Sequence, residues 1–176
     1  MIGISKLYCG TVEPSDALRY GRHSSTLPSH LLQFSKDKRP VVVWNVTRKC
    51  NLKCVHCYAQ ATDEALANEL TTTEGKALID DLAQFGAPVM LFSGGEPLAQ
   101  PRFLEAVLAA CNRRDIHATL DTSGSAPVAV LDRVLPRLQL VLFDLKMMDP
   151  HLHRKYTGVS NGPILENLKR LDGGST

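Results

Sequence analysis

The sequence predicts an α/β fold in which parallel strands alternate with helices to form a partial (β/α) barrel. Four short apolar runs rich in β-branched residues are separated by segments with helical periodicity. After the first run, the strands recur roughly every 25 residues, a spacing that accommodates a right-handed crossover helix. A polar motif follows each run. In parallel sheets of this kind the functional groups lie at the carboxyl ends of the strands.

The composition narrows the classes of function. With 176 residues, 44% of them hydrophobic, the chain can form one domain with a substantial core. The net charge of +2, with scattered Lys and Arg, does not indicate a nucleic-acid partner. No stretch approaches the roughly 20 apolar residues of a membrane span, and no signal peptide is evident, so we expect a cytoplasmic chain with no membrane partner.

The chain divides into three expected segments. Residues 1–40 contain several prolines and no sustained periodicity, which predicts an irregular N-terminal extension. Residues 41–171 carry the alternating pattern and form the expected core, and residues 172–176 form a flexible tail. Cys9 lies in the extension, as a free thiol or a spare metal ligand.

The first strand and helix have clear local signals. The run VVVWNV at 41–46 is typical of a strand buried on both faces. Thr71 and Glu74 have the spacing of a capping box, which predicts a helix that starts there and stops at Gly86.

Three more strand and helix pairs follow. A strand at 88–92 leads to a helix begun by Pro101, with Cys111 on its apolar face and therefore in the core. His151 and His153 are two residues apart and are expected to be exposed. The remaining elements are a strand at 116–121, a helix at 127–135, a strand at 139–145 and a helix at 163–171.

The most informative motif is a C-x3-C-x2-C loop after the first strand. Cys50, Cys54 and Cys57 can hold three irons of a 4Fe-4S cluster and leave the fourth iron open. Three cysteines within eight residues also favour metal binding over disulfides. The alternative is a zinc site, which needs four ligands, and Cys9 or His56 could be the fourth.

The second strand is followed by Gly94, Gly95 and Glu96. The missing β-carbons would let a ligand approach the backbone closely, and free backbone groups could bind an amino-acid moiety. Glu96 would then accept a hydrogen bond from the ligand's ammonium. A simple tight turn is the alternative interpretation.

The third and fourth strands end in further polar residues. Asp121, Thr122 and Ser123 could bind a ribose or a carboxylate, or could merely turn the chain into the next helix. Asp144 and Lys146 share a side-chain parity, so both can point into one site. Solvated or paired rim charges are the alternative.

The segments 44–58 and 93–97 closely resemble the radical S-adenosylmethionine (SAM) superfamily. The resemblance implies that a 4Fe-4S cluster on the three cysteines reduces SAM, which splits into methionine and a 5′-deoxyadenosyl radical that abstracts hydrogen from the substrate. Residues 94–96 would hold the methionine amino group. The electron donor would be a protein such as flavodoxin or ferredoxin.

Two branches of this superfamily are resembled. Residues 1–115 are similar to the alternative heme biosynthesis branch, of the didecarboxysiroheme deacetylase and heme d1 type, which implies side-chain removal from an iron tetrapyrrole. Residues 120–171 are similar to glycyl-radical-enzyme activases of the pyruvate formate-lyase activating enzyme type, whose partner is a glycyl radical enzyme. There, residues matching Asp121, Thr122, Asp144 and Lys146 lie around SAM, with a monovalent cation nearby.

The family's core has six strand–helix units, and this sequence has about four. The fourth strand would then be an exposed edge, which favours self-association through that strand. A non-catalytic fragment that binds the cluster or SAM, or a hybrid of the two branches, is a further alternative to a complete enzyme.

Overall fold

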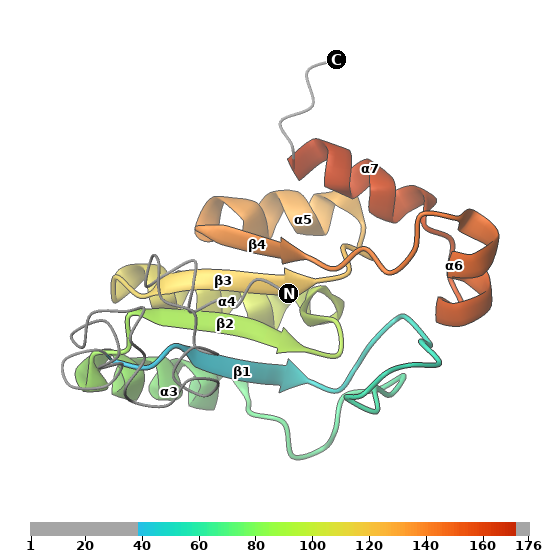
Figure 1. Cartoon of the computed structure of the whole chain (residues 1–176). Helices are drawn as coiled ribbons and strands as arrows, with labels where there is room; N and C mark the ends of the chain where they lie inside the picture. The colour runs from blue at the N-terminus through green and yellow to red at the C-terminus, as the bar shows by residue number, and fades with distance from the viewer. Residues whose placement is uncertain (1–38, 172–176) are drawn as a thin grey trace, which may run out of the picture. The chain divides into compact units, whose positions relative to one another are not determined.

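The computed structural model describes residues 39–171, so Cys9 lies outside the described residues. Four parallel strands form one sheet in the order β1-β2-β3-β4 (Figure 1). Their bounds are β1 Val42–Thr47, β2 Val89–Gly94, β3 His117–Thr122 and β4 Leu140–Phe143. The predicted α/β class with parallel strands is confirmed. The fourth strand is shorter than the predicted 139–145.

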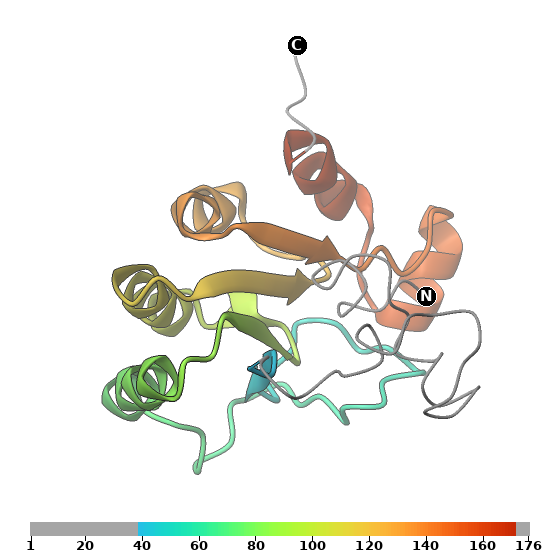
Figure 2. The same ribbon diagram turned by 60° about the vertical axis from the view of Figure 1, so that its left-hand side comes forward.

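Three helices pack on one face of the sheet, as Figure 2 shows. Two further helices and two 3-10 turns complete the described chain, and none of these helices is long and apolar enough to cross a membrane. The α-helices are α3 Thr72–Phe85, α4 Pro101–Arg113 and α5 Val128–Val134 on the face, then α6 Pro150–Thr157 and α7 Gly162–Leu171. The 3-10 turns are η3 Pro97–Ala99 and η4 Leu135–Arg137.

The core lies between the sheet and these three helices. Alternate residues of β2 and β3 meet the apolar faces of the helices, because side chains of a strand alternate between the two faces of a sheet. Cys111 is fully buried there, as predicted, and burial raises the pKa of its thiol to about 12. The largest fully buried side chains of this core include Ile79, Met90, Phe92, Leu104, Leu108, Leu120 and Leu131.

The predicted capping box of α3 is present. The Thr71 hydroxyl accepts a hydrogen bond from Glu74 N at 3.3 Å, and Thr71 N donates to Glu74 Oε2 at 2.8 Å. Gly86 ends the helix with φ of 82°, a left-handed conformation that glycine adopts at little cost. This helix therefore begins and ends where its sequence signals predict.

Replacing Thr71 by alanine should lower the free energy of unfolding by about 1 kcal/mol, since the Glu74 amide loses its capping oxygen. Urea unfolding measures the change. Thr73→Ala, in the same exposed first turn but without a capping role, is the matched control. An equal loss in both variants would contradict the assignment of the cap.

Helix α6 was not predicted. Asp149 caps its first turn by accepting from Leu152 N at 2.8 Å, and Gly158 ends it with φ of 81°. The prediction that both histidines are exposed holds for His151 and is wrong for His153, which is fully buried. The helical turn explains the difference, because residues two apart on a helix point in very different directions.

Strand β4 pairs with β3 and with no other strand of the described chain. An apolar groove lies between β4 and α7, lined in part by Leu138, Val141, Phe143, Leu168 and Leu171.

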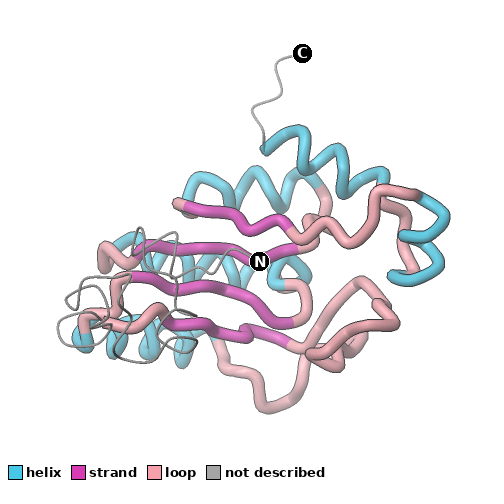
Figure 3. Tube along the Cα trace, viewed as in Figure 1, coloured by secondary structure: helices cyan, strands magenta, loops and turns pink. Residues whose placement is uncertain are grey.

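A long loop connects β1 to α3. Figure 3 shows that this loop leaves β1 and runs past the carboxyl ends of the strands before α3 begins. That loop carries the three clustered cysteines.

Candidate functional site

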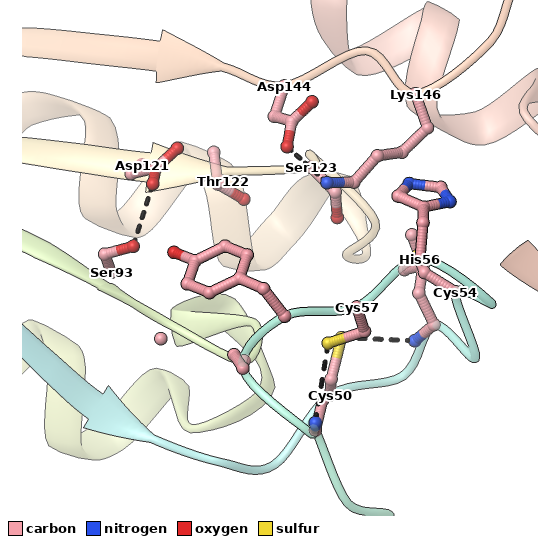
Figure 4. Close-up of a pocket in the computed structure, with 16 residues that line it drawn as sticks. Cys50, Cys54, His56, Cys57, Ser93, Asp121, Thr122, Ser123, Asp144 and Lys146 are labelled. Atoms are coloured by element: carbon pink, nitrogen blue, oxygen red, sulfur yellow. Dashed lines mark hydrogen bonds and ion pairs between the residues drawn. The ribbon is translucent and has the colours of Figure 1, made fainter.

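The polar motifs that follow the four strands meet in one pocket at the carboxyl ends of the strands (Figure 4). This convergence follows from the parallel order of the sheet, which brings all four carboxyl ends to one edge. Of the predicted site residues, the pocket is lined by Cys50, Cys54, Cys57, Gly94, Gly95, Asp121, Thr122, Ser123, Asp144 and Lys146. Glu96 is the exception.

Two of the three thiols in the cysteine loop, residues 50–57, accept hydrogen bonds from backbone amides. Leu52 N donates to Cys50 Sγ at 3.4 Å, and Ala61 N donates to Cys57 Sγ at 3.5 Å. Amide donors directed at sulfur stabilise a thiolate and, when a cluster is bound, tune its potential. The loop therefore has the donor groups that an iron–sulfur site requires.

The thiols are partly buried. Burial raises the pKa of Cys50, and it also raises the pKa of Cys54, although the Lys146 ammonium opposes the shift at Cys54. Within residues 39–171, no three His, Cys, Asp or Glu side chains converge on one point that would hold a single ion. A 4Fe-4S cluster makes a different demand, since each thiolate binds a separate iron. His56 also lines the pocket beside these thiols.

The two glycines bring β2 against the start of the cysteine loop. A β-carbon on Gly95 would lie 2.3 Å from Lys49 O, and one on Gly94 would lie 2.5 Å from Thr47 O. Gly95 N donates to Thr47 O and Glu96 N donates to Lys49 O, each at 2.8 Å. The missing β-carbons therefore let two segments of the chain's own backbone approach each other. Both glycines also line the pocket, and their predicted contact with a ligand stays a prediction.

Glu96 is buried behind the pocket, with 1% of its surface exposed. Its Oε1 accepts from Thr122 Oγ1 at 2.6 Å and from Leu98 N at 3.1 Å. Its Oε2 accepts from Ser123 Oγ at 2.6 Å and from Ser123 N at 3.0 Å. Burial raises the pKa of Glu96, while these donors pull it down. The Glu96 carboxylate thus joins the β2 turn to the β3 turn, and its predicted bond to a ligand ammonium stays a prediction.

Charged groups from β3 and β4 line the other side of the pocket. Asp121 Oδ2 accepts from Ser93 Oγ at 2.8 Å, and Asp144 forms an ion pair with Lys146. Partial burial disfavours the Lys146 ammonium, but Asp144 outweighs it and raises the pKa of Lys146. Ser93 was not predicted as a site residue. The register pairs Phe92 with Leu120, the residues just before Ser93 and Asp121, and this pairing across strands is not marked in the sequence.

Two amide side chains support the turn after β3 from outside the pocket. Asn51 Nδ2 donates to Ser125 O, and the buried Asn167 of α7 donates to Gly124 O at 2.8 Å and to Ala126 O at 2.9 Å. Sequence analysis missed both residues. Their partners lie more than 40 residues away in the chain, so no local pattern marks them.

The family of the chain follows from a comparison with known protein families. The radical SAM superfamily matches residues 44–173, which include all four polar motifs of the pocket. This chain belongs to the radical SAM superfamily. Radical SAM enzymes bind a 4Fe-4S cluster and SAM, and they accept electrons from a donor.

Two radical SAM relatives correspond to the two resemblances of the sequence. The chain is 69% identical over 173 residues to Fe-coproporphyrin III synthase of Methanosarcina barkeri, across 98% of this chain and 40% of the relative. It is 35% identical over 144 residues to 4-hydroxyphenylacetate decarboxylase activating enzyme of Clostridioides difficile, across 80% of this chain and 45% of the relative. The chain thus spans less than half the length of these relatives. The similarity to Fe-coproporphyrin III synthase covers 98% of this chain, so it extends well beyond the residues 1–115 on which the heme-branch resemblance was noted.

The radical SAM fold is also found among solved structures. Streptococcus suis SuiB bound to S-adenosylmethionine superposes with a TM-score of 0.65 at 18% identity, over 97% of this chain and 43% of SuiB. At this identity the similarity concerns the fold alone.

Proposed function

We propose that this chain is the cluster- and SAM-binding part of a radical SAM enzyme that removes a side chain from an iron tetrapyrrole in heme biosynthesis. The observation that carries the proposal is the 69% identity to Fe-coproporphyrin III synthase, which extends over 98% of this chain. The pocket at the carboxyl ends of the four strands supports the proposal, since it brings the three cysteine thiols together with the polar groups that would bind SAM.

The three thiols of Cys50, Cys54 and Cys57 would hold three irons, and SAM would meet the fourth. When bound, the cluster supplies one electron to the sulfonium of SAM, which yields methionine and a 5′-deoxyadenosyl radical. The methionine ammonium is a hydrogen-bond donor, as are the amides of Gly95 and Glu96, so the carbonyl oxygens of this turn are the proposed acceptors for it.

The residues after β3 and β4 would bind the rest of SAM. The carboxylates of Asp121 and Asp144 suit a ribose or, through a monovalent cation, the SAM carboxylate. The hydroxyls of Thr122 and Ser123 already donate to Glu96, so they would meet SAM as acceptors. Lys146 already neutralises Asp144, so the pocket can accept a carboxylate without an excess of negative charge. A flavodoxin or ferredoxin is the proposed electron donor. The proposed site of self-association is the edge of β4 that pairs with no strand within residues 39–171.

Anaerobic reconstitution with iron and sulfide tests this function. The chain should become brown and, after reduction with dithionite, give a cluster EPR signal that shifts when SAM is added. 5′-Deoxyadenosine should then form. A colourless chain that binds zinc in preference would contradict the proposal.

A glycyl-radical-enzyme activase is the second candidate, favoured by the 35% identity to the C. difficile activating enzyme. Product analysis separates the two functions. The first predicts loss of acetate from didecarboxysiroheme, and the second predicts a glycyl radical on a partner enzyme, visible by EPR. A chain that binds the cluster and SAM but gives neither product would be a binding part without turnover.

A further inference from the structure

The last turn of α6 is bonded to the cysteine loop on both sides of Cys54. Lys53 N donates to Thr157 O at 2.7 Å, and Val55 N donates to Tyr156 O at 3.0 Å. The last four carbonyls of any α-helix lack partners within the helix. Here two of these carbonyls accept from the two amides that flank Cys54, so the helix end fixes the backbone of that cysteine.

This last turn is itself held by a buried histidine. His153 Nδ1 lies 2.8 Å from Val159 O, a carbonyl that can only accept, so Nδ1 carries the proton and donates. The Thr157 hydroxyl donates to His153 O at 2.8 Å. In the described part of the chain, His153 Nε2 has no hydrogen-bond partner, so the ring acts through Nδ1. The imidazole therefore joins the helix to the residues just after it.

The segment around α6 is also tied to the strand β4 side of the pocket. Asn161 is buried, and its Nδ2 donates to Met148 O at 2.7 Å and to Met147 O at 3.2 Å. These two carbonyls come directly after Lys146, which lines the pocket. The segment thus connects two parts of the pocket, Lys146 on one side and Cys54 on the other, without lining it.

We propose that His153 is a positioning residue for the cluster site. By holding the last turn of α6, it keeps the Tyr156 and Thr157 carbonyls in place, and these carbonyls fix the backbone around Cys54 relative to the other two cysteines. The inference deepens the proposed function and rests on its assignment of the three cysteines. It makes a separate claim about the metal-free chain, which can be tested without a cluster.

Amide hydrogen exchange in the metal-free full chain is the direct test. His153→Leu keeps a similar side-chain volume but removes the Nδ1 donor. Exchange of the Lys53 and Val55 amides should then accelerate about tenfold, which is the expected effect of losing one hydrogen bond that supports the last turn of α6. His153→Asn, whose amide can reach the position of Nδ1, should restore most of the protection. Alkylation of Cys111, which is fully buried, reports whether the core stays folded.

Unchanged exchange at Lys53 and Val55 in His153→Leu would overturn the proposal. If Cys111 becomes reactive in His153→Leu, that variant has unfolded and its exchange rates are not informative. Amide exchange in the wild-type chain then tests the proposal. Its Lys53 and Val55 amides should then open together with those of the α6 end, such as Thr157, and much faster exchange of the two loop amides would refute the support.

The reconstituted protein gives a second readout. The EPR signal of the reduced cluster should change shape in His153→Leu and return in His153→Asn, because a displaced thiolate alters the geometry at its iron. A wild-type chain that shows the coupled exchange but assembles no cluster would refute the proposed function and leave the role of His153 standing. A cluster that assembles normally in a chain without coupled exchange would refute the role of His153 and leave the proposed function standing.

Discussion

Alanine in place of Cys54 is expected to leave the reconstituted chain without a stable 4Fe-4S cluster and to lower SAM cleavage by at least about a thousandfold. Cys54 is the middle ligand of the loop and lines the pocket together with Cys50 and Cys57. Two thiolates leave two irons of the cluster without protein ligands, so iron is lost rather than merely displaced. Iron and sulfide content per chain, together with 5′-deoxyadenosine formation, measure the effect.

Cys111→Ala is the matched control for this substitution. Its thiol is in the core, at 0% exposure, and its Sγ contacts Met90 Sδ at 3.9 Å, far from any role in the pocket. This variant should keep the full iron content and lose only some stability. Normal cluster loading in Cys54→Ala would show that the assignment of the three cysteines is wrong.

The second large effect is expected at Glu96. Replacing it by glutamine should lower the free energy of unfolding by about 2 to 3 kcal/mol, since a buried amide group would face the Ser123 amide that now donates to a carboxylate oxygen. SAM binding should weaken as well, because Thr122 and Ser123 lose the acceptor that orients them. Urea unfolding and titration with SAM measure the two effects.

The partly buried Glu105, whose side chain is 26% exposed, provides the comparison for this change. It forms a surface ion pair with Arg133 at 2.8 Å, and Glu105→Gln should change stability by no more than about 0.5 kcal/mol. If Glu96→Gln were equally mild, the carboxylate would not be a structural link between the two turns. If only SAM binding fell, with stability unchanged, a direct contact with the ligand would be the better explanation.

The stability difference between wild type and Glu96→Gln should also depend on pH. Burial raises the pKa of Glu96 in the folded state above its ordinary value of 4.5. Between 4.5 and the folded pKa, the folded chain binds more protons than the unfolded chain, so the Glu96 contribution falls as the pH rises. The advantage of wild type should therefore be largest below 4.5, and an advantage that grows with pH would contradict the direction of the shift.

Local signals in the sequence predicted most of the fold. The β-branched run at 41–46 became β1, and the capping pair Thr71 and Glu74 became the start of α3, because each depends on neighbours a few residues away. The expectation that β1 is buried on both faces was wrong, since Val43 is 58% exposed. Helix α6 had comparable signals, an aspartate cap followed by Pro150 and a closing Gly158. They were overlooked because its eight residues show no apolar stripe of the usual length.

The sequence predicted which motifs share the pocket, but not what each one does there. The role of Glu96 depends on partners 26 and 27 residues away in the chain, and the role of Gly95 depends on the carbonyl of Lys49. Only the parallel packing of β1, β2 and β3 brings these groups together. A motif therefore identifies the site, while the fold decides which of its side chains face the ligand and which face the protein.

The bonds from Asn167 to the turn after β3 have a consequence for the order of biosynthesis. Gly124 O and Ala126 O receive their donor from a residue that the ribosome adds more than 40 positions later. The cysteine loop is translated long before that turn can be completed. During synthesis the three thiols are thus in place before the turn after β3 can receive the hydrogen bonds of Asn167 from α7.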